Sequence, residues 1–265
     1  MFRLQALVLA LGIVPAVAGA AHATGVPLPL NKPAWIAAKE KPAVPIPRPK
    51  PARAAGADAS PSFPRPATAG TWPADAVAAA RAECQELLKG LDIRFTPRPA
   101  IGGPDGCGTA APVEVNSIAG VELTPPAMLN CRMARHLHQW ISLSVQPAAL
   151  VKLKTRVTTI NTASSYVCRR RNGLKGGKLS EHARANALDM SGFKFAKSDA
   201  VTVDDGWGGI LQSIGLSRGS SFLDAIRADA CGHFTTVLGP GSDPHHGGHF
   251  HVDAIRRKNG GRICK

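Results

Sequence analysis

The stretch TTVLGPGSDPHHGGHFHVDAI, residues 235–255, gives the first indication of the fold. Its two ends, Thr235–Leu238 and His249–Ile255, are rich in β-branched and aromatic residues. Between them, residues 239–248 consist mainly of glycine, proline and histidine. Such a pattern predicts two strands joined by a loop.

Further strands and helices are predicted N-terminal to this stretch. Residues 187–195 predict a short strand, and the β-branched residues of 157–170 predict a strand or a bent pair of strands. Apolar residues at helical spacing predict helices over 74–91, 126–143 and 221–230, the second beginning at the pair Pro125-Pro126. Because strands and helices mix without a regular βαβ alternation, we expect an α+β domain with a small antiparallel sheet flanked by helices.

The N-terminal quarter of the chain predicts export. Residues 1–23 combine a basic start at Arg3, an apolar run over 4–20 and the small-residue site Ala21-His22-Ala23, which is typical of a cleaved secretory signal peptide. An uncleaved membrane anchor is the alternative, but the run is short for a span of ~20 residues. We expect an exported protein of the periplasm or cell envelope, without a stable membrane span after cleavage.

Residues 24–72 alternate proline with alanine, lysine and arginine, which predicts an extended linker of polyproline II type. The folded domain is therefore expected over 73–265, long enough for one sizeable core. All six cysteines lie in this domain and none forms a C-x-x-C pair. In an exported protein they predict three disulfides, for which we expect the sequential pairing Cys84–Cys107, Cys131–Cys168 and Cys231–Cys264.

The formal net charge of +14 suits an anionic partner. Export argues against nucleic acid, so we expect peptidoglycan or another anionic envelope polymer. A basic exported protein with no such partner is the alternative. The sequence indicates no particular oligomeric state.

Two segments carry the chemistry, SEHARANALD at 180–189 and HGGHFHVD at 246–253. Catalytic zinc usually has three protein ligands from His, Asp or Glu, with a fourth position for water. The period of two in a strand puts His249 and His251 on one face and Phe250 on the other. His182 and Asp189, on a turn followed by a strand, complete a metal set that we expect at one end of the sheet. A solvated histidine-rich loop and a structural His–Asp hydrogen bond are the alternatives.

These segments resemble a known group of zinc peptidases. Ser180-x-His182 followed by Ala187-x-Asp189 is similar to the signature of D-Ala-D-Ala carboxypeptidases, and with His249-x-His251 it resembles the wider lysostaphin, D-Ala-D-Ala carboxypeptidase and sonic hedgehog group. The order at His246, His249 and His251 is closest to penicillin-insensitive murein endopeptidases. The region from about Cys84 to Cys264 also resembles the bacterial extensin-like C-terminal domain.

The resemblance implies zinc ligation by His182, Asp189 and His251, with His249 beside the metal handling protons or orienting water. In the carboxypeptidase register, His249 would replace His251 as the ligand. A glutamate base of the carboxypeptidase type is missing, so we expect His246 to serve, with Asp243 and Glu181 as further candidates. The stretch 164–171 resembles the carboxypeptidase strand whose arginine binds substrate, which suggests Arg169 for a substrate carboxylate or the oxyanion; a solvated strand end is the alternative.

The expected function is zinc-dependent hydrolysis of amide bonds in peptidoglycan stem peptides or cross-links, by endopeptidase or carboxypeptidase action on an L,D or D,D bond. Two alternatives are a non-catalytic, zinc-containing wall-binding module and a disulfide-stapled wall protein without metal. His136, His138 and His233 are expected to pack or face solvent, and Trp207 to anchor the core or line a groove.

Overall fold

The computed structural model describes residues 71–265 except 175 and 208–216, so the predicted signal peptide and all but the end of the predicted linker lie outside the described residues. Trp72, at that end, donates from its indole Nε1 to the carbonyl of Ile101 at 2.8 Å. Among the described helices, none has both the length and the apolar composition needed to cross a membrane.

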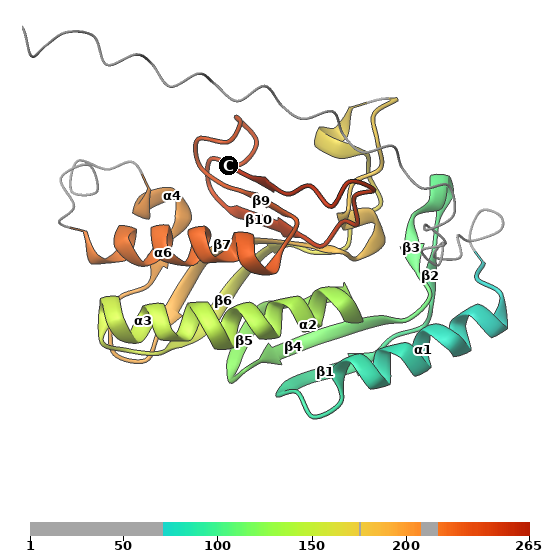
Figure 1. Ribbon diagram of the computed structural model, residues 1–265, viewed down its shortest axis with the longest axis horizontal. Helices are drawn as coiled ribbons and strands as arrows, with labels where there is room; N and C mark the ends of the chain where they lie inside the picture. Colours follow the sequence, from blue (N-terminus) through green and yellow to red (C-terminus); the bar gives the residue numbers. More distant parts are fainter. Residues whose placement is uncertain (1–70, 175, 208–216) are drawn as a thin grey trace, which may run out of the picture. The chain divides into compact units, whose positions relative to one another are not determined.

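A nine-stranded sheet forms the centre of the domain, with the order β1-β4-β5-β6-β7-β10-β9-β11 and β8 paired with β7 (Figure 1). Most neighbours are antiparallel, but β5 with β6 and β9 with β11 are parallel. The sheet is therefore mixed and larger than the small antiparallel sheet expected from the sequence. Its strands are β1 (Ile93–Pro97), β4 (Pro112–Ile118), β5 (Val121–Asn130), β6 (Val157–Ser164), β7 (Ala187–Phe195), β8 (Val201–Thr202), β9 (Thr236–Leu238), β10 (Phe250–Asp253) and β11 (Ile263–Cys264), and a separate pair is formed by β2 (Ile101–Gly102) and β3 (Gly108–Thr109).

Helices cover one face of this sheet (Figure 1). They are α1 (Ala74–Leu88), the continuous run of α2 (Cys131–Trp140), the π-helical segment η3 (Ile141–Val145) and α3 (Gln146–Leu153), and α6 (Arg218–His233), with the short α4 (Val203–Gly206) beside β8. The Asn130 side chain caps α2 by accepting from the Met133 N–H. Between the helices and the sheet, Phe222 of α6 meets Phe193 and Phe195 of β7 edge to face. The apolar side chains between the helices and the sheet form the hydrophobic core, so the face of the sheet that meets the helices is buried.

The predicted strand at 187–195 coincides with β7, and the helices expected at 74–91 and 221–230 are present with shifted ends. The helix expected from 126 begins only at Cys131, because Pro125 and Pro126 belong to β5. They lie where the β4–β5 register shifts and beyond the β5–β6 pairing, a place in a sheet where proline removes no ladder hydrogen bond. The strands β1, β4 and β5 were not predicted.

All six cysteines are paired, as expected, but the pairing is Cys84–Cys131, Cys107–Cys168 and Cys231–Cys264. Two of the three predicted bridges were therefore wrong. The physical reason is topological: α1 packs beside α2, which brings Cys84 to Cys131, although Cys107 is closer in sequence.

Candidate metal centre

Two neighbouring strands fix half of the candidate site. In the antiparallel ladder of β7 and β10, Asp189 lies directly opposite His251. Leu188 and Val252, which flank them in sequence, are buried in the core on the helix side. Because side chains alternate along a strand, Asp189 and His251 project from the opposite face of the sheet.

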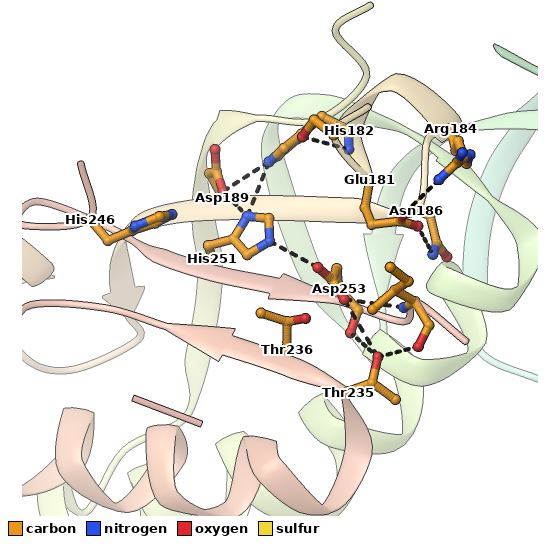
Figure 2. Close-up of polar contacts among 12 residues, drawn as sticks. Glu181, His182, Arg184, Asn186, Asp189, Thr235, Thr236, His246, His251 and Asp253 are labelled. Atoms are coloured by element: carbon orange, nitrogen blue, oxygen red, sulfur yellow. Dashed lines mark hydrogen bonds and ion pairs between the residues drawn. The ribbon is translucent and has the colours of Figure 1, made fainter. Parts of the chain in front are cut away.

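A short turn supplies the third residue. His182 begins the single-turn 3-10 helix η5 (His182–Arg184), which ends at Ala185 in a left-handed conformation with φ 52°. The buried Glu181 carboxylate braces this turn by accepting from Arg184 Nη1 at 2.8 Å and from Asn186 Nδ2 at 2.7 Å. Figure 2 shows the carboxylate directed at these two partners and away from His182, so Glu181 is engaged in holding the turn.

The imidazoles of His182 and His251 and the carboxylate of Asp189 converge on one point (Figure 2). His182 Nε2 lies 3.1 Å from both Asp189 Oδ1 and His251 Nδ1, and His251 Nδ1 lies 2.8 Å from Asp189 Oδ1. All three residues are buried, and one potential ligand atom from each lies within 4.8 Å of the others. This is the single such group among the described residues that could hold a metal ion.

The outer nitrogens of both imidazoles are already committed. His182 Nδ1 lies 2.5 Å from the carbonyl oxygen of Ser165, and His251 Nε2 lies 3.3 Å from Asp253 Oδ2. A carbonyl or carboxylate oxygen only accepts, so each outer nitrogen carries the proton and donates it. The inner nitrogen of His182, Nε2, therefore carries no proton, and its lone pair points towards Asp189 and His251, as a metal ligand requires.

Three inward-facing acceptors need a positive charge between them. Burial would lower the pKa of His251, but its hydrogen bonds to Asp189 and Asp253 raise that pKa to about 9, so without a metal a proton provides the charge. Burial raises the pKa of Asp189, and hydrogen bonds from His182 and His251 outweigh it, holding that pKa well below its ordinary value. The donor set of two imidazoles and one carboxylate fits a divalent cation such as zinc in place of that proton.

The loop before β10 adds a second pair of groups. Asp243 lies 2.8 Å and 2.9 Å, through its two oxygens, from His246 Nδ1. The His246 ring lies 5.6 Å from the His251 ring and 5.2 Å from the His249 ring, measured between centroids. Since Nδ1 donates to Asp243, the Nε2 atom of His246 is left as an acceptor.

His249 lies beside the cluster, with Nε2 3.8 Å from Asp189 Oδ1. Burial lowers the pKa of His249, and Asp189 only partly offsets this effect. His251, at 2.8 Å, is nearer to Asp189 Oδ1 than His249, at 3.8 Å.

The remaining residues singled out in the sequence lie elsewhere. The Arg169 carbonyl accepts from the Ser180 N–H, and its guanidinium has no ion-pair partner in the part of the chain the structure describes. The neighbouring Arg170 is paired with Asp105 at 2.9 Å, so it is committed to the loop. The other histidines expected to be structural pack away from the cluster: His136 lies against Phe234, and His233 lies 3.3 Å from the Ser144 hydroxyl.

Residues 82–265 match the family described as extensin-like protein C-terminus. The chain belongs to this family. No curated protein and no solved structure matches the chain. The His182, Asp189 and His251 cluster thus lies wholly inside the extensin-like domain, together with the Asp243–His246 pair.

Sequence reasoning assigned no role to Asp253, which orients His251 in the structure. The period of two in His251-x-Asp253 places both on one strand face and could have suggested it. The Ser165 carbonyl, which orients His182, left no signal, because any residue at that position has the same backbone oxygen.

Proposed function

We propose that the extensin-like domain is an exported zinc-dependent hydrolase that cleaves amide bonds in peptidoglycan stem peptides or cross-links. The observation that carries the proposal is the orientation of the two imidazoles. Each donates its outer N–H to a fixed acceptor, and each inner nitrogen faces Asp189. Outer-nitrogen partners of this kind are typical of histidines that ligate a metal.

His182, Asp189 and His251 would hold the ion, leaving one position for water and substrate. A zinc ion held by these residues would lower the pKa of a bound water towards ~7 and polarise the carbonyl of the bond to be cut. His246 then accepts the proton of the attacking water at Nε2 and delivers it to the leaving amine. Asp243, bonded to Nδ1, holds His246 in the tautomer that can accept and stabilises the imidazolium that forms.

The substrate class rests on charge and on the resemblance of the two motifs to murein peptidases. Stem peptides end in carboxylates, and the chain has a net charge of +14. Arg169 is half-buried and precedes the turn that bears His182, where it would take such a carboxylate. His249, beside Asp189, would orient the water or share the proton.

A non-catalytic zinc-containing wall-binding module is the second candidate, favoured by one observation. The positions three residues before His249 and His251 are His246 and Gly248, so neither provides the carboxylate base of the carboxypeptidases. In that case the metal cluster would hold a wall peptide without cutting it.

The test is incubation of the purified protein with isolated sacculi, with zinc or with a chelator, followed by mass analysis of the soluble fragments. We expect peptide fragments that disappear with chelator and with His182→Ala or Asp189→Ala. His136→Ala, on a helix remote from the cluster, is the matched histidine control and should retain activity. Unchanged sacculi from folded, zinc-loaded protein that still sediments with them would favour the wall-binding module.

A further inference from the structure

The outer side of the η3–α3 segment is the most apolar exposed surface in the described part of the chain. Among the described residues, six large apolar side chains are exposed. Three of the six belong to the η3–α3 segment: Leu143 at 70%, Leu150 at 44% and Val151 at 64%. Spacings of seven and eight residues place all three on one side of a helix. The other side is fully used, because Ala149 is buried and α3 packs against α6.

Four cationic side chains border this surface at the C-terminal end of α3. Lys152 and Lys154 belong to the helix end, and Arg156 follows it. Lys197 lies beside them, because its N–H donates to the Thr155 hydroxyl at 3.1 Å and the Ala196 N–H donates to the Arg156 carbonyl at 3.0 Å.

All four cations are exposed, and within the described residues none forms an ion pair. The loop after β7 contributes a single carboxylate, Asp199. The cations therefore exceed the acids at this edge, which leaves a positive field beside the exposed Leu and Val side chains.

We propose that the outer side of η3–α3 docks onto the headgroup region of an anionic phospholipid bilayer. Leu143, Leu150 and Val151 enter the boundary between headgroups and acyl chains, while the four cations contact lipid phosphates. Aliphatic side chains flanked by Lys and Arg on one helix side are the features by which peripheral helices bind such surfaces. This docking is independent of the proposed hydrolysis.

Two other occupants fit less well. A second copy related by a two-fold axis would gather both sets of four cations around one interface, at an electrostatic cost. A wall polymer of sugars and short peptides offers anionic groups but no continuous apolar phase in which leucine and valine can be buried. Docking by the helix face also leaves the metal cluster free, because Asp189 and His251 project from the opposite face of the sheet.

The test uses the chain from Thr24, the expected mature form, and sedimentation with vesicles of equal parts phosphatidylglycerol and phosphatidylcholine. We expect binding that weakens about tenfold for each of Leu150→Asn and Val151→Asn. It should weaken about fivefold for each of Lys152→Gln and Lys197→Gln. Vesicles of phosphatidylcholine alone should bind far less protein.

Matched controls separate this face from the rest of the molecule. Leu174→Asn removes an apolar side chain that is 64% exposed, like Val151, from the loop between β6 and β7. Arg81→Gln with Lys89→Gln removes two exposed cations from α1 and its C-cap. Both controls should bind like the parent, and the basic linker is common to all variants. Hydrogen exchange of the parent should slow over residues 143–156 when vesicles are added.

Equal binding by parent and α3 variants, loss of binding in the Leu174 variant, or protection confined to other residues would each overturn the proposal. Failure of the parent to bind anionic vesicles would overturn it as well. All the substitutions are at exposed positions, so we expect unchanged thermal unfolding midpoints. Measuring these midpoints shows that the variants remain folded.

Discussion

Replacing Asp253 with asparagine is the sharpest test of the metal centre, because it removes a hydrogen-bond acceptor while keeping the shape. Asp253 is buried, and its Oδ1 accepts from the Ile255 N–H at 3.1 Å. Its Oδ2 accepts from His251 Nε2 at 3.3 Å. The amide oxygen of Asp253→Asn keeps the hydrogen bond from the Ile255 N–H, so its NH₂ faces His251.

An NH₂ group cannot accept the Nε2 proton of His251. At pH 7 and without metal, His251 carries a proton on both nitrogens. Zinc must therefore displace the proton on Nδ1, the atom that lies 2.8 Å from Asp189 Oδ1, in the parent as well as in the variant. In the parent, the proton that remains on Nε2 is donated to Asp253. In Asp253→Asn that N–H faces an NH₂ group, so the zinc-binding form of His251 loses its acceptor. Changes to such outer partners typically cost 10–100-fold in metal affinity, so we expect a loss of about 1.4–2.7 kcal/mol in zinc binding free energy.

Zinc affinity is measured by competition with a chromogenic chelator, for the parent, Asp253→Asn and Glu181→Gln. Glu181 is an equally buried carboxylate that contacts neither imidazole and binds Arg184 and Asn186 instead. Its amide can still accept from one of these partners, so the affinity should change only a few-fold. If folded Asp253→Asn protein binds zinc as tightly as the parent, the argument from the lost acceptor is refuted.

Three further predictions follow from charges and cross-links. Because the pKa of His251 is about 9 without metal, zinc binding at pH 7 should release about one proton, measured by calorimetry in buffers of different ionisation enthalpy; no release would contradict the shared site. Because of this raised pKa, protonated His251 stabilises the metal-free fold. This stabilisation is complete below the unfolded pKa of ~6.5 and is lost as the pH rises through about 9. The lowered pKa of Asp253 means that its carboxylate stabilises the fold above pH ~4. Denaturant titrations of metal-free protein should therefore give the largest unfolding free energy between about pH 4 and 6.5, and a maximum near pH 9 would be inconsistent. Finally, Cys107→Ser with Cys168→Ser opens a bridge spanning 61 residues and should lower the free energy of unfolding by about 4 kcal/mol; peptide mapping without reductant should recover this bridge, and recovery of Cys84–Cys107 would disprove the observed pairing.

Strand β7 was predictable because its sequence shows its environment directly. Seven of its nine residues are buried, and the stretch 187–195 is mostly apolar, interrupted by Asp189, Ser191 and Lys194. Strand β4 carries a similar signal, with Val113, Val115 and Ile118 buried in the core, but the prediction passed over it. The start of α2 was misplaced for a different reason: a proline pair is as compatible with an irregular strand as with a helix N-terminus, and only the neighbouring strands decide between them.

The metal cluster could be foreseen further than the sheet around it. A His-x-His spacing in a strand and a His–Asp pair seven residues apart restrict the geometry within each segment. The pairing of β7 with β10 then brings the two segments together. What the sequence could not show is which groups accept hydrogen bonds from the outer nitrogens of His182 and His251. The disulfides failed for the same reason, since the nearness of Cys84 to Cys131 follows from the packing of α1 on α2, a contact far apart in sequence.

The three ligands do not depend equally on the fold. Asp189 and His251 lie opposite each other in a ladder between central strands, so their spacing is set by backbone hydrogen bonds. His182 lies on a turn outside this ladder, and its carbonyl accepts a hydrogen bond from the Val167 N–H. Val167 is next to Cys168, whose bridge to Cys107 ties this segment to the loop between β2 and β3. Loss of this disulfide should therefore free the segment that holds His182 and weaken metal binding at the candidate site, while the pairing of Asp189 with His251 in the ladder persists.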